Sequence, residues 1–132
     1  MNSKVILGVD PGLRKTGFGL IEFKKKVNYI DSGVIVTAQG ALPTKIKTLF
    51  INMLEIIKEY KPNFVSFEKV FININPNSSL LLGQARGALI ASAVSKNLNI
   101  FEYTALQVKK SVVGKGHANK QQVKLMVTNI LN

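Results

Sequence analysis

The sequence VILGVDPGLRKTGFGLIEF, residues 5–23, is the clearest indication of the fold class. Its first part, residues 5–10, is a short apolar run that ends in Asp-Pro-Gly, a combination typical of a turn. Its second part, residues 17–23, is rich in aromatic and branched residues, as strands are. Three lysines, Lys24 to Lys26, follow as a solvated hairpin connection, and residues 27–37 continue in the same strand-like pattern. The pattern predicts three consecutive strands.

The rest of the chain alternates between helical and extended patterns. Residues 44–60 carry apolar side chains three and four positions apart, which predicts an amphipathic helix. FVSFE, residues 64–68, is typical of a buried central strand. A helix capped by Ser78 or Ser79, a strand and a last amphipathic helix are predicted at residues 79–96, 98–103 and 120–131. The sequence therefore predicts one α/β domain over residues 1–132, with a mixed five-stranded sheet flanked by helices.

Composition limits the possible chemistry. The 132 residues include 18 Lys and Arg against 7 Asp and Glu, a net charge of +11, which favours nucleic acid first and an anionic membrane surface second. The chain has no cysteine and one histidine, His117, which excludes disulfides, zinc fingers, thiol nucleophiles and a histidine metal cage. We find no signal peptide and no stretch suited to cross a membrane, so we expect a cytoplasmic protein without a membrane partner.

Two carboxylates stand at the ends of predicted buried strands. Asp10 ends the first strand, and Glu68 ends FVSFE. If these strands are parallel neighbours, both side chains emerge at one edge of the sheet, where a divalent cation relieves their repulsion. Metal ions held there can activate water and stabilise the leaving oxygen in phosphodiester hydrolysis. The alternatives are an Asx turn at Asp10 and a salt bridge from Glu68 to Lys69.

The segment after Glu102 has no acidic residue. It carries five lysines and the single histidine, and its glycines at 114 and 116 free the backbone for close approach to phosphate. These features favour contact with a nucleic-acid backbone, although a lysine run is also compatible with a merely solvated surface. Phe71 follows Glu68 and either packs in the core or stacks on an unpaired base.

Four segments of the sequence resemble one family. They are ILGVDPGLRKTGFGLIE, FVSFEKVF, LGQARGALIASAV and FEYTALQVKKSVVGKGHANKQQV, at residues 6–22, 64–71, 82–94 and 101–123. Together they are similar to the RuvC family of bacterial Holliday junction resolvases. The resemblance implies a ribonuclease H-like fold and a homodimeric endonuclease that depends on Mg²⁺ or Mn²⁺, with two ions in a complete site. It also implies symmetric hydrolysis of four-way DNA junctions in recombination and repair, together with the branch-migration proteins RuvA and RuvB.

The resemblance assigns roles to individual residues. Asp10 and Glu68 match the first two catalytic, metal-binding carboxylates, and Phe71 matches an aromatic residue that stacks at the open centre of the junction. The remaining matches form two groups. Lys109 and Lys120 match basic residues of the family that contact DNA near the scissile phosphate. Lys115 and His117 are expected to bind DNA because they lie in the basic glycine loop, and the comparison gives His117 no catalytic role. The small residues expected at the dimer interface are Gly83, Ala85 and Gly87.

The acidic residues depart from the family pattern. The family continues beyond the position of Asn132 with an acidic motif and a final helix, and no acid follows Glu102 here. The resemblance thus implies a C-terminally incomplete domain with two of about four metal-binding acids. Three readings remain open: a shortened chain with weak or no nuclease activity, a relative that binds junctions without cutting, or an acid supplied by another chain. A fragment of an actin-like sugar kinase or ATPase, which also opens with a strand, an Asp and a glycine turn, is the alternative from another class.

Overall fold

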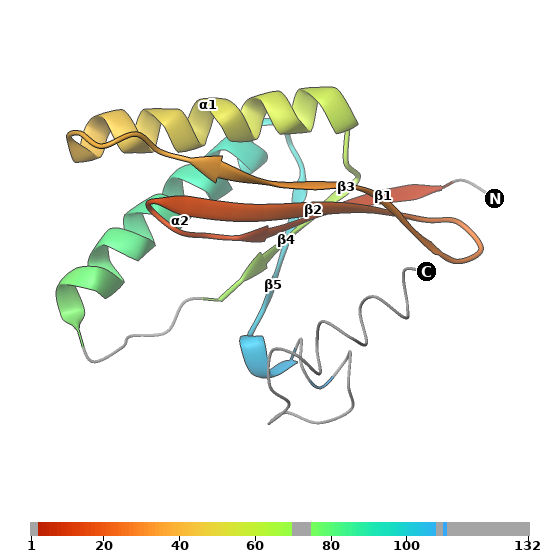
Figure 1. Ribbon diagram of the computed structural model, residues 1–132. Helices are drawn as coiled ribbons and strands as arrows, with labels where there is room; N and C mark the ends of the chain where they lie inside the picture. The colour runs from red at the N-terminus through yellow and green to blue at the C-terminus, as the bar shows by residue number, and fades with distance from the viewer. Residues whose placement is uncertain (1–2, 70–74, 108–109, 111–132) are drawn as a thin grey trace.

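A mixed five-stranded sheet organises the molecule (Figure 1). The computed structural model describes residues 3–69, 75–107 and 110. The strands lie in the order β3-β2-β1-β4-β5; β1 pairs antiparallel with β2 and parallel with β4. The elements are β1 (Lys4–Asp10), β2 (Lys15–Phe23), β3 (Val27–Val36), α1 (Leu42–Tyr60), β4 (Phe64–Glu68), α2 (Pro76–Ser95) and β5 (Asn99–Tyr103). The expected mixed sheet of five strands is confirmed.

Both helices begin earlier than the sequence pattern predicts. Pro43 lies in the first turn of α1, where its missing N–H removes no helical hydrogen bond, so the helix begins at Leu42. The side chain of Asn75 caps α2 by accepting hydrogen bonds from the backbone N–H groups of Asn77 and Ser78. The expectation that Ser78 or Ser79 caps this helix is therefore wrong. The helix predicted at residues 120–131 lies outside the described residues.

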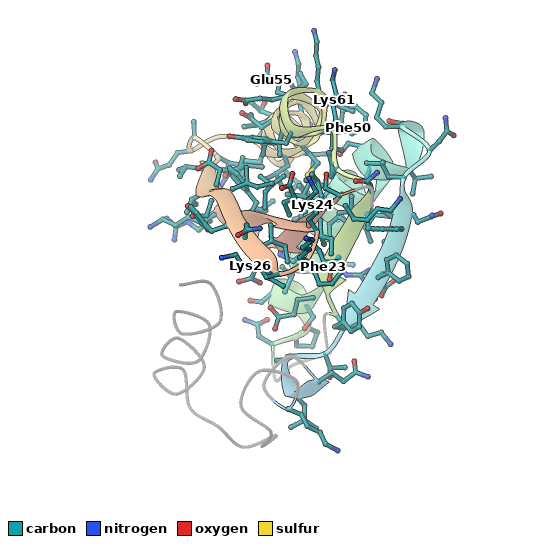
Figure 2. The ribbon with its side chains drawn as sticks, turned by 90° about the vertical axis from the view of Figure 1, so that its right-hand side faces the viewer. Phe23, Lys24, Lys26, Phe50, Glu55 and Lys61 are labelled. Atoms are coloured by element: carbon teal, nitrogen blue, oxygen red, sulfur yellow. The ribbon has the colours of Figure 1, made fainter. Side chains whose placement is uncertain are left out.

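One face of the sheet carries the hydrophobic core. Alternate residues of β1 and β4 point to this face and are almost completely buried, and helices α1 and α2 both pack on it (Figure 2). The core side chains are Leu7, Val9, Leu20, Ile35, Leu49, Met53, Ile56, Ile57, Val65, Phe67, Ala85, Leu89 and Ala93. Because side chains alternate along a strand, the residues between them point to the opposite face. Neither α1 nor α2 covers that face, which we call the open face.

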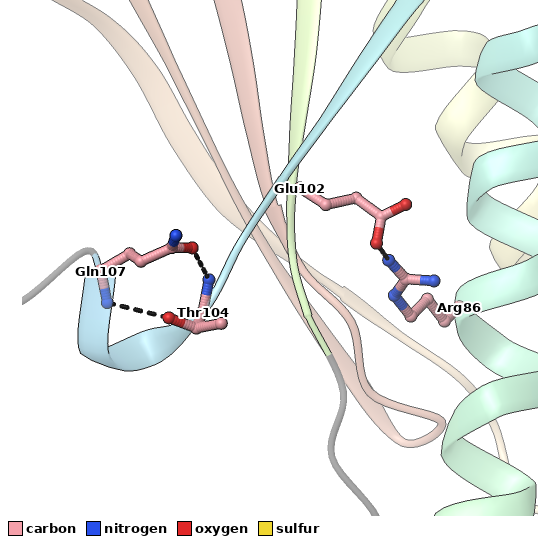
Figure 3. Close-up of polar contacts among 4 residues, drawn as sticks. All are labelled: Arg86, Glu102, Thr104 and Gln107. Carbon is pink, nitrogen blue, oxygen red and sulfur yellow. Dashed lines mark hydrogen bonds and ion pairs between the residues drawn. The ribbon is translucent and has the colours of Figure 1, made fainter.

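Polar contacts connect α2 to the edge strand β5 and begin a further helical turn (Figure 3). Arg86 of α2 forms an ion pair with Glu102 of β5 on the helix-covered side of the sheet. The hydroxyl of Thr104 accepts a hydrogen bond from the backbone N–H of Gln107, whose side-chain oxygen accepts one from the backbone N–H of Thr104. This reciprocal pair is a capping box. It fixes the direction in which the chain leaves Tyr103.

A tyrosine–aspartate hydrogen bond joins the end of α1 to strand β3. The hydroxyl of Tyr60 donates to the carboxylate of Asp31, which also accepts a hydrogen bond from the backbone N–H of Ser32. The bond from Tyr60, and then that from Ser32, lower the pKa of Asp31 below its usual value, since both stabilise the charged form. The same contact with Asp31 raises the pKa of Tyr60 to about 12. The pair therefore stabilises the fold only while Asp31 is ionised and Tyr60 is protonated.

Replacing Tyr60 with phenylalanine should lower the melting temperature at neutral pH and have less effect in acid. Asp31 has a lowered pKa in the folded state, so its contribution is present above its unfolded value of 3.8 and is lost as pH falls through the folded value. At the alkaline end the contribution is lost as pH rises toward about 12. Thermal unfolding at about pH 7 and about pH 2.5 measures the difference. Tyr29→Phe is the control, because the Tyr29 hydroxyl pairs with the uncharged hydroxyl of Ser32; equal losses for Tyr60→Phe at both pH values would contradict the assignment.

Candidate active site

Asp10 and Glu68 lie at the same edge of the sheet. Strands β1 and β4 are parallel neighbours in a register that pairs Val9 with Phe67, and each carboxylate follows one of these residues directly. Val9 and Phe67 are buried beneath the helices, so Asp10 and Glu68 point to the open face. Asp10 is exposed and Glu68 is half-buried. The structure thus brings together the two carboxylates that the sequence singled out; their catalytic role remains a prediction.

A concavity of about 350 Å³ opens beside the two carboxylates. Its floor consists of residues with small side chains or none, at matching positions on three adjacent strands. Gly8 of β1 pairs with Gly19 of β2 and with Ser66 of β4, and Asp10 pairs with Gly17. The complete lining is Gly8, Val9, Asp10, Gly17, Phe18, Gly19, Ser66, Phe67, Glu68 and Tyr103. This arrangement leaves the carboxylates accessible from a shallow groove on the open face.

Two buried threonines hold the turn that follows Asp10. The Thr16 hydroxyl donates to the carbonyl of Gly12 at 2.7 Å and accepts from the backbone N–H of Gly12 at 3.1 Å. The Thr37 hydroxyl donates to the carbonyl of Leu13 at 2.8 Å. Gly12 accepts no larger residue without rearrangement, because a Cβ atom there would lie 2.2 Å from the carbonyl oxygen of Lys15. These contacts give the turn one conformation and so fix the backbone from which the Asp10 side chain projects.

Replacing Thr16 with valine should lower the free energy of unfolding by about 1–3 kcal/mol, because both backbone groups of Gly12 lose a partner next to a fully buried side chain. Thr16→Ser, which keeps the hydroxyl, should cost less. The matched control is Thr48→Val, since the Thr48 hydroxyl donates to the carbonyl of Thr44 on an exposed turn of α1. Urea unfolding measures all three variants. Losses of the same size for Thr16→Val and Thr48→Val would show that the turn contacts do not contribute as described.

The donor chemistry of the site fits a hard divalent cation. Carboxylate oxygens are the ligands that Mg²⁺ prefers, and Mg²⁺ is commonly held by one or two carboxylates together with waters and substrate phosphates. Across residues 3–69, 75–107 and 110, no group of three or more His, Cys, Asp or Glu side chains is placed to hold a metal ion. Within that part of the chain Asp10 and Glu68 are the residues that could bind one on the open face.

The other candidate residues fall into three groups. Gly83 and Gly87 are exposed on α2, whereas Ala85 is completely buried against the sheet, which corrects its expected place at a dimer interface. Glu102 is paired with Arg86 on the other face of the sheet, away from the two carboxylates. Five residues lie outside the described part of the chain: Phe71, Lys109, Lys115, His117 and Lys120.

Sequence reasoning missed Thr16 and Thr37. Thr16 stands at a position of β2 that alternation assigns to the core, and a polar residue at such a position was the one available signal. The partner of Thr37 could not be identified in this way, because Leu13 lies 24 residues earlier in the sequence.

Both the sequence and the structure are similar to those of known proteins. The family model described as crossover junction endodeoxyribonuclease RuvC matches residues 6–132. The RuvC protein of Nitrosomonas eutropha is 54% identical over 127 residues, which cover 96% of this chain and 71% of that relative. The structure of T. thermophilus RuvC in complex with a Holliday junction substrate is similar with a TM-score of 0.91 and 29% identity, covering 97% of this chain and 79% of that one. The yeast mitochondrial Holliday junction resolvase Ydc2, at 12% identity and a TM-score of 0.68, shares the fold.

Proposed function

The chain belongs to the RuvC family of crossover junction endodeoxyribonucleases, and we propose that Asp10 and Glu68 form the metal-dependent centre with which it resolves Holliday junctions. It has the ribonuclease H-like fold of this family and the family's function, hydrolysis of DNA at a crossover junction. The family is metal-dependent. The alternatives of a junction-binding protein without cleavage and of a kinase or ATPase fragment find no support among these relatives.

One observation carries the assignment of the centre. Two carboxylates end adjacent parallel strands, point to the same face of the sheet, which neither α1 nor α2 covers, and line the same concavity. Carboxylates that are buried for structural reasons are normally paired with a cation or a hydrogen-bond donor inside the fold. Asp10 is instead exposed at the rim of the groove, directly before the turn that the hydroxyls of Thr16 and Thr37 hold by hydrogen bonds. Two acids held on neighbouring strands beside one groove are what binding of a divalent cation and a phosphodiester requires.

The residues of this chain supply position and negative charge. Asp10 and Glu68 would hold Mg²⁺, with Mn²⁺ also suitable, and a complete site would contain two ions. Divalent ions supply Lewis acidity toward the phosphate and lower the pKa of bound water, which makes hydroxide available at neutral pH. The strands β1 and β4 keep the two acids at a fixed separation, so little reorganisation is needed when the scissile phosphate enters. The groove admits the DNA strand from the open face.

Junction DNA is the partner that the family relationship and the charge favour. The net charge of +11 provides attraction to phosphates. We assign DNA contacts to Lys109 and Lys120, and stacking at the junction centre to Phe71, on the strength of the sequence resemblance. Lys115 and His117 are assigned to DNA because they lie in the acid-free glycine loop. RuvA and RuvB are proposed partners on the same basis.

A homodimer through α2 is the second part of the proposal. An exposed ridge on this helix runs through Leu80, Gly83, Gly87, Ala91 and Val94, which recur three or four residues apart. Its small central residues let another backbone approach closely, and its apolar ends gain from burial. A twofold dimer would present two active sites to two strands of a junction. Sedimentation equilibrium tests it, and a species with the mass of one chain at all concentrations would contradict it.

Location follows from the same relationship. No helix in the described residues is long and apolar enough to span a membrane. A protein that acts on chromosomal junctions meets its substrate in the cytoplasm of a bacterium, and we assign the chain to that compartment.

A binding experiment tests the substrate class. Gel-shift titrations in EDTA should show tighter binding to a four-way junction than to a linear duplex of the same sequence. Affinity should fall steeply with salt, with a slope of about −0.9 per phosphate contacted. Equal affinity for duplex and junction would contradict junction recognition. Specific binding of ATP would instead favour the alternative of a kinase or ATPase fragment.

A further inference from the structure

Three alternate residues of β2 form a row on the open face. Gly17 pairs with Asp10, and Gly19 pairs with Gly8, so both belong to the face that carries the carboxylates. Lys15 lies two residues before Gly17 and is therefore on the same face, about 6.8 Å further along the strand. The residues between them, Thr16 among them, point toward the helices.

Within the part of the chain that the structure describes, packing and backbone conformation give no reason for glycine at positions 17 and 19. Neither residue has the positive φ that favours glycine. Among the described residues, a Cβ atom at Gly19 would meet nothing within 4 Å, and one at Gly17 would be in ordinary contact with the Cβ of Asp10 at 3.9 Å. Glycine inside a strand costs about 0.5–1 kcal/mol relative to alanine. What the two glycines provide is an open groove floor, as glycines in strands do where a ligand approaches the backbone.

Lys15 adds a positive charge at the carboxylate end of this row. Its side chain is exposed, and within the described part of the chain no carboxylate forms an ion pair with it. A divalent metal ion held by the two carboxylates would neutralise their charge. The positive charge of Lys15 would then lack a balancing negative charge unless an anion also enters the site. The phosphates of a DNA strand are such anions, and ammonium groups bind them well.

We propose that β2 seats the sugar–phosphate backbone of the DNA strand to be cut, with Gly17 and Gly19 giving it room and Lys15 binding one of its phosphates. The inference rests on the proposed function and adds to it a binding site for the DNA backbone on β2. A side chain larger than hydrogen at position 17 or 19 would hold the strand away from Asp10 and Glu68. The two glycines therefore act by their size, and Lys15 acts by its charge.

Two variants and two matched controls test this DNA-binding site on β2. Gly19→Val adds a β-branched side chain in open space, and Lys15→Gln removes one charge from the row. Asn99→Val makes a comparable exposed change on the same face at the other end of the sheet, on β5. Lys24→Gln removes an exposed charge from the turn between β2 and β3; Lys24 is labelled in Figure 2. Each protein is examined by thermal unfolding, by junction binding in EDTA over a salt series, and by single-turnover junction cleavage with Mg²⁺.

Gly19→Val should keep or raise the melting temperature. It should slow cleavage by about tenfold or more, because the added side chain would hold the DNA strand away from Asp10 and Glu68. Lys15→Gln should weaken junction binding and reduce the magnitude of the salt slope by about one. Asn99→Val and Lys24→Gln should leave cleavage and the salt slope unchanged. If Gly19→Val lowers the melting temperature, Gly19→Ala, with the smaller side chain, replaces it and should still slow cleavage.

Normal cleavage by both glycine variants, or an unchanged salt slope for Lys15→Gln, would overturn the proposal that β2 binds the DNA strand to be cut. These outcomes differ from failure of the proposed function. That function fails if the unsubstituted chain does not cleave junctions, or if Asp10→Asn cleaves as fast as the unsubstituted chain. The binding measurements in EDTA do not depend on cleavage, so they test the role of Lys15 in either case.

Discussion

Replacing Asp10 with asparagine is expected to slow junction cleavage by more than about 100-fold. Loss of a residue that only supports a metal ligand costs about 10–100-fold, and loss of a direct ligand costs more. Asparagine keeps the size and shape of the side chain but removes the charge that holds a divalent cation. Because Asp10 is exposed, the substitution should leave the melting temperature nearly unchanged. Single-turnover cleavage of a labelled junction with Mg²⁺ measures the effect.

The matched control is Asp31→Asn, which makes the same chemical change on β3, where the carboxylate bonds to Tyr60. It should lower the melting temperature somewhat and leave cleavage at the unsubstituted rate. Glu68→Gln should resemble Asp10→Asn in its cleavage defect, since both acids belong to one centre. Cleavage by Asp10→Asn within about threefold of the unsubstituted rate would remove Asp10 from the catalytic machinery.

Replacing Phe67 with alanine is expected to give the largest loss of stability. Its side chain is completely buried on the central strand β4, beneath the helices that form the core. Deleting a buried phenylalanine ring costs about 3–5 kcal/mol, and domains of this kind have about 5–15 kcal/mol of stability in all. Urea unfolding should therefore show a much lower midpoint with a similar slope.

Phe23→Ala is the control for this loss. Phe23 ends β2 beside the lysine turn and is 48% exposed, so removing its ring should change the free energy of unfolding much less (Figure 2). Similar midpoints for Phe67→Ala and Phe23→Ala would contradict the core described above. Because Phe67 directly precedes Glu68, Phe67→Ala should also reduce cleavage even where it remains folded.

The fold could be predicted from local patterns because each strand is a short, distinct run. The apolar runs that end at Asp10 and Glu68 identified two strands and the two acids together, and the parallel pairing was confirmed by the register. The start of α2 was missed because Asn75, Pro76 and two serines all favour a helix start, and only the backbone conformation shows which residue caps it.

The placement of individual side chains could be predicted less well. The buried and exposed faces of α2 could not be distinguished from the sequence, because small and apolar residues of the helix lie on all of its sides. Only packing shows that Ala85 faces the sheet while Gly83 and Gly87 face outward. The role of Lys15 emerges only from the register of β2 against β1, and that of Thr37 from a contact between distant parts of the chain.

Mapping of the cleavage sites on a synthetic four-way junction is the most direct test of metal-dependent junction resolution by Asp10 and Glu68. The chain is incubated with junctions labelled on each strand, in Mg²⁺, in Mn²⁺ and in EDTA, beside Asp10→Asn. We expect paired nicks at symmetric positions in two opposing strands, present with either ion and absent in EDTA and in Asp10→Asn. No cleavage with either ion, or cleavage that persists in EDTA, would contradict a metal-dependent junction resolvase built on Asp10 and Glu68.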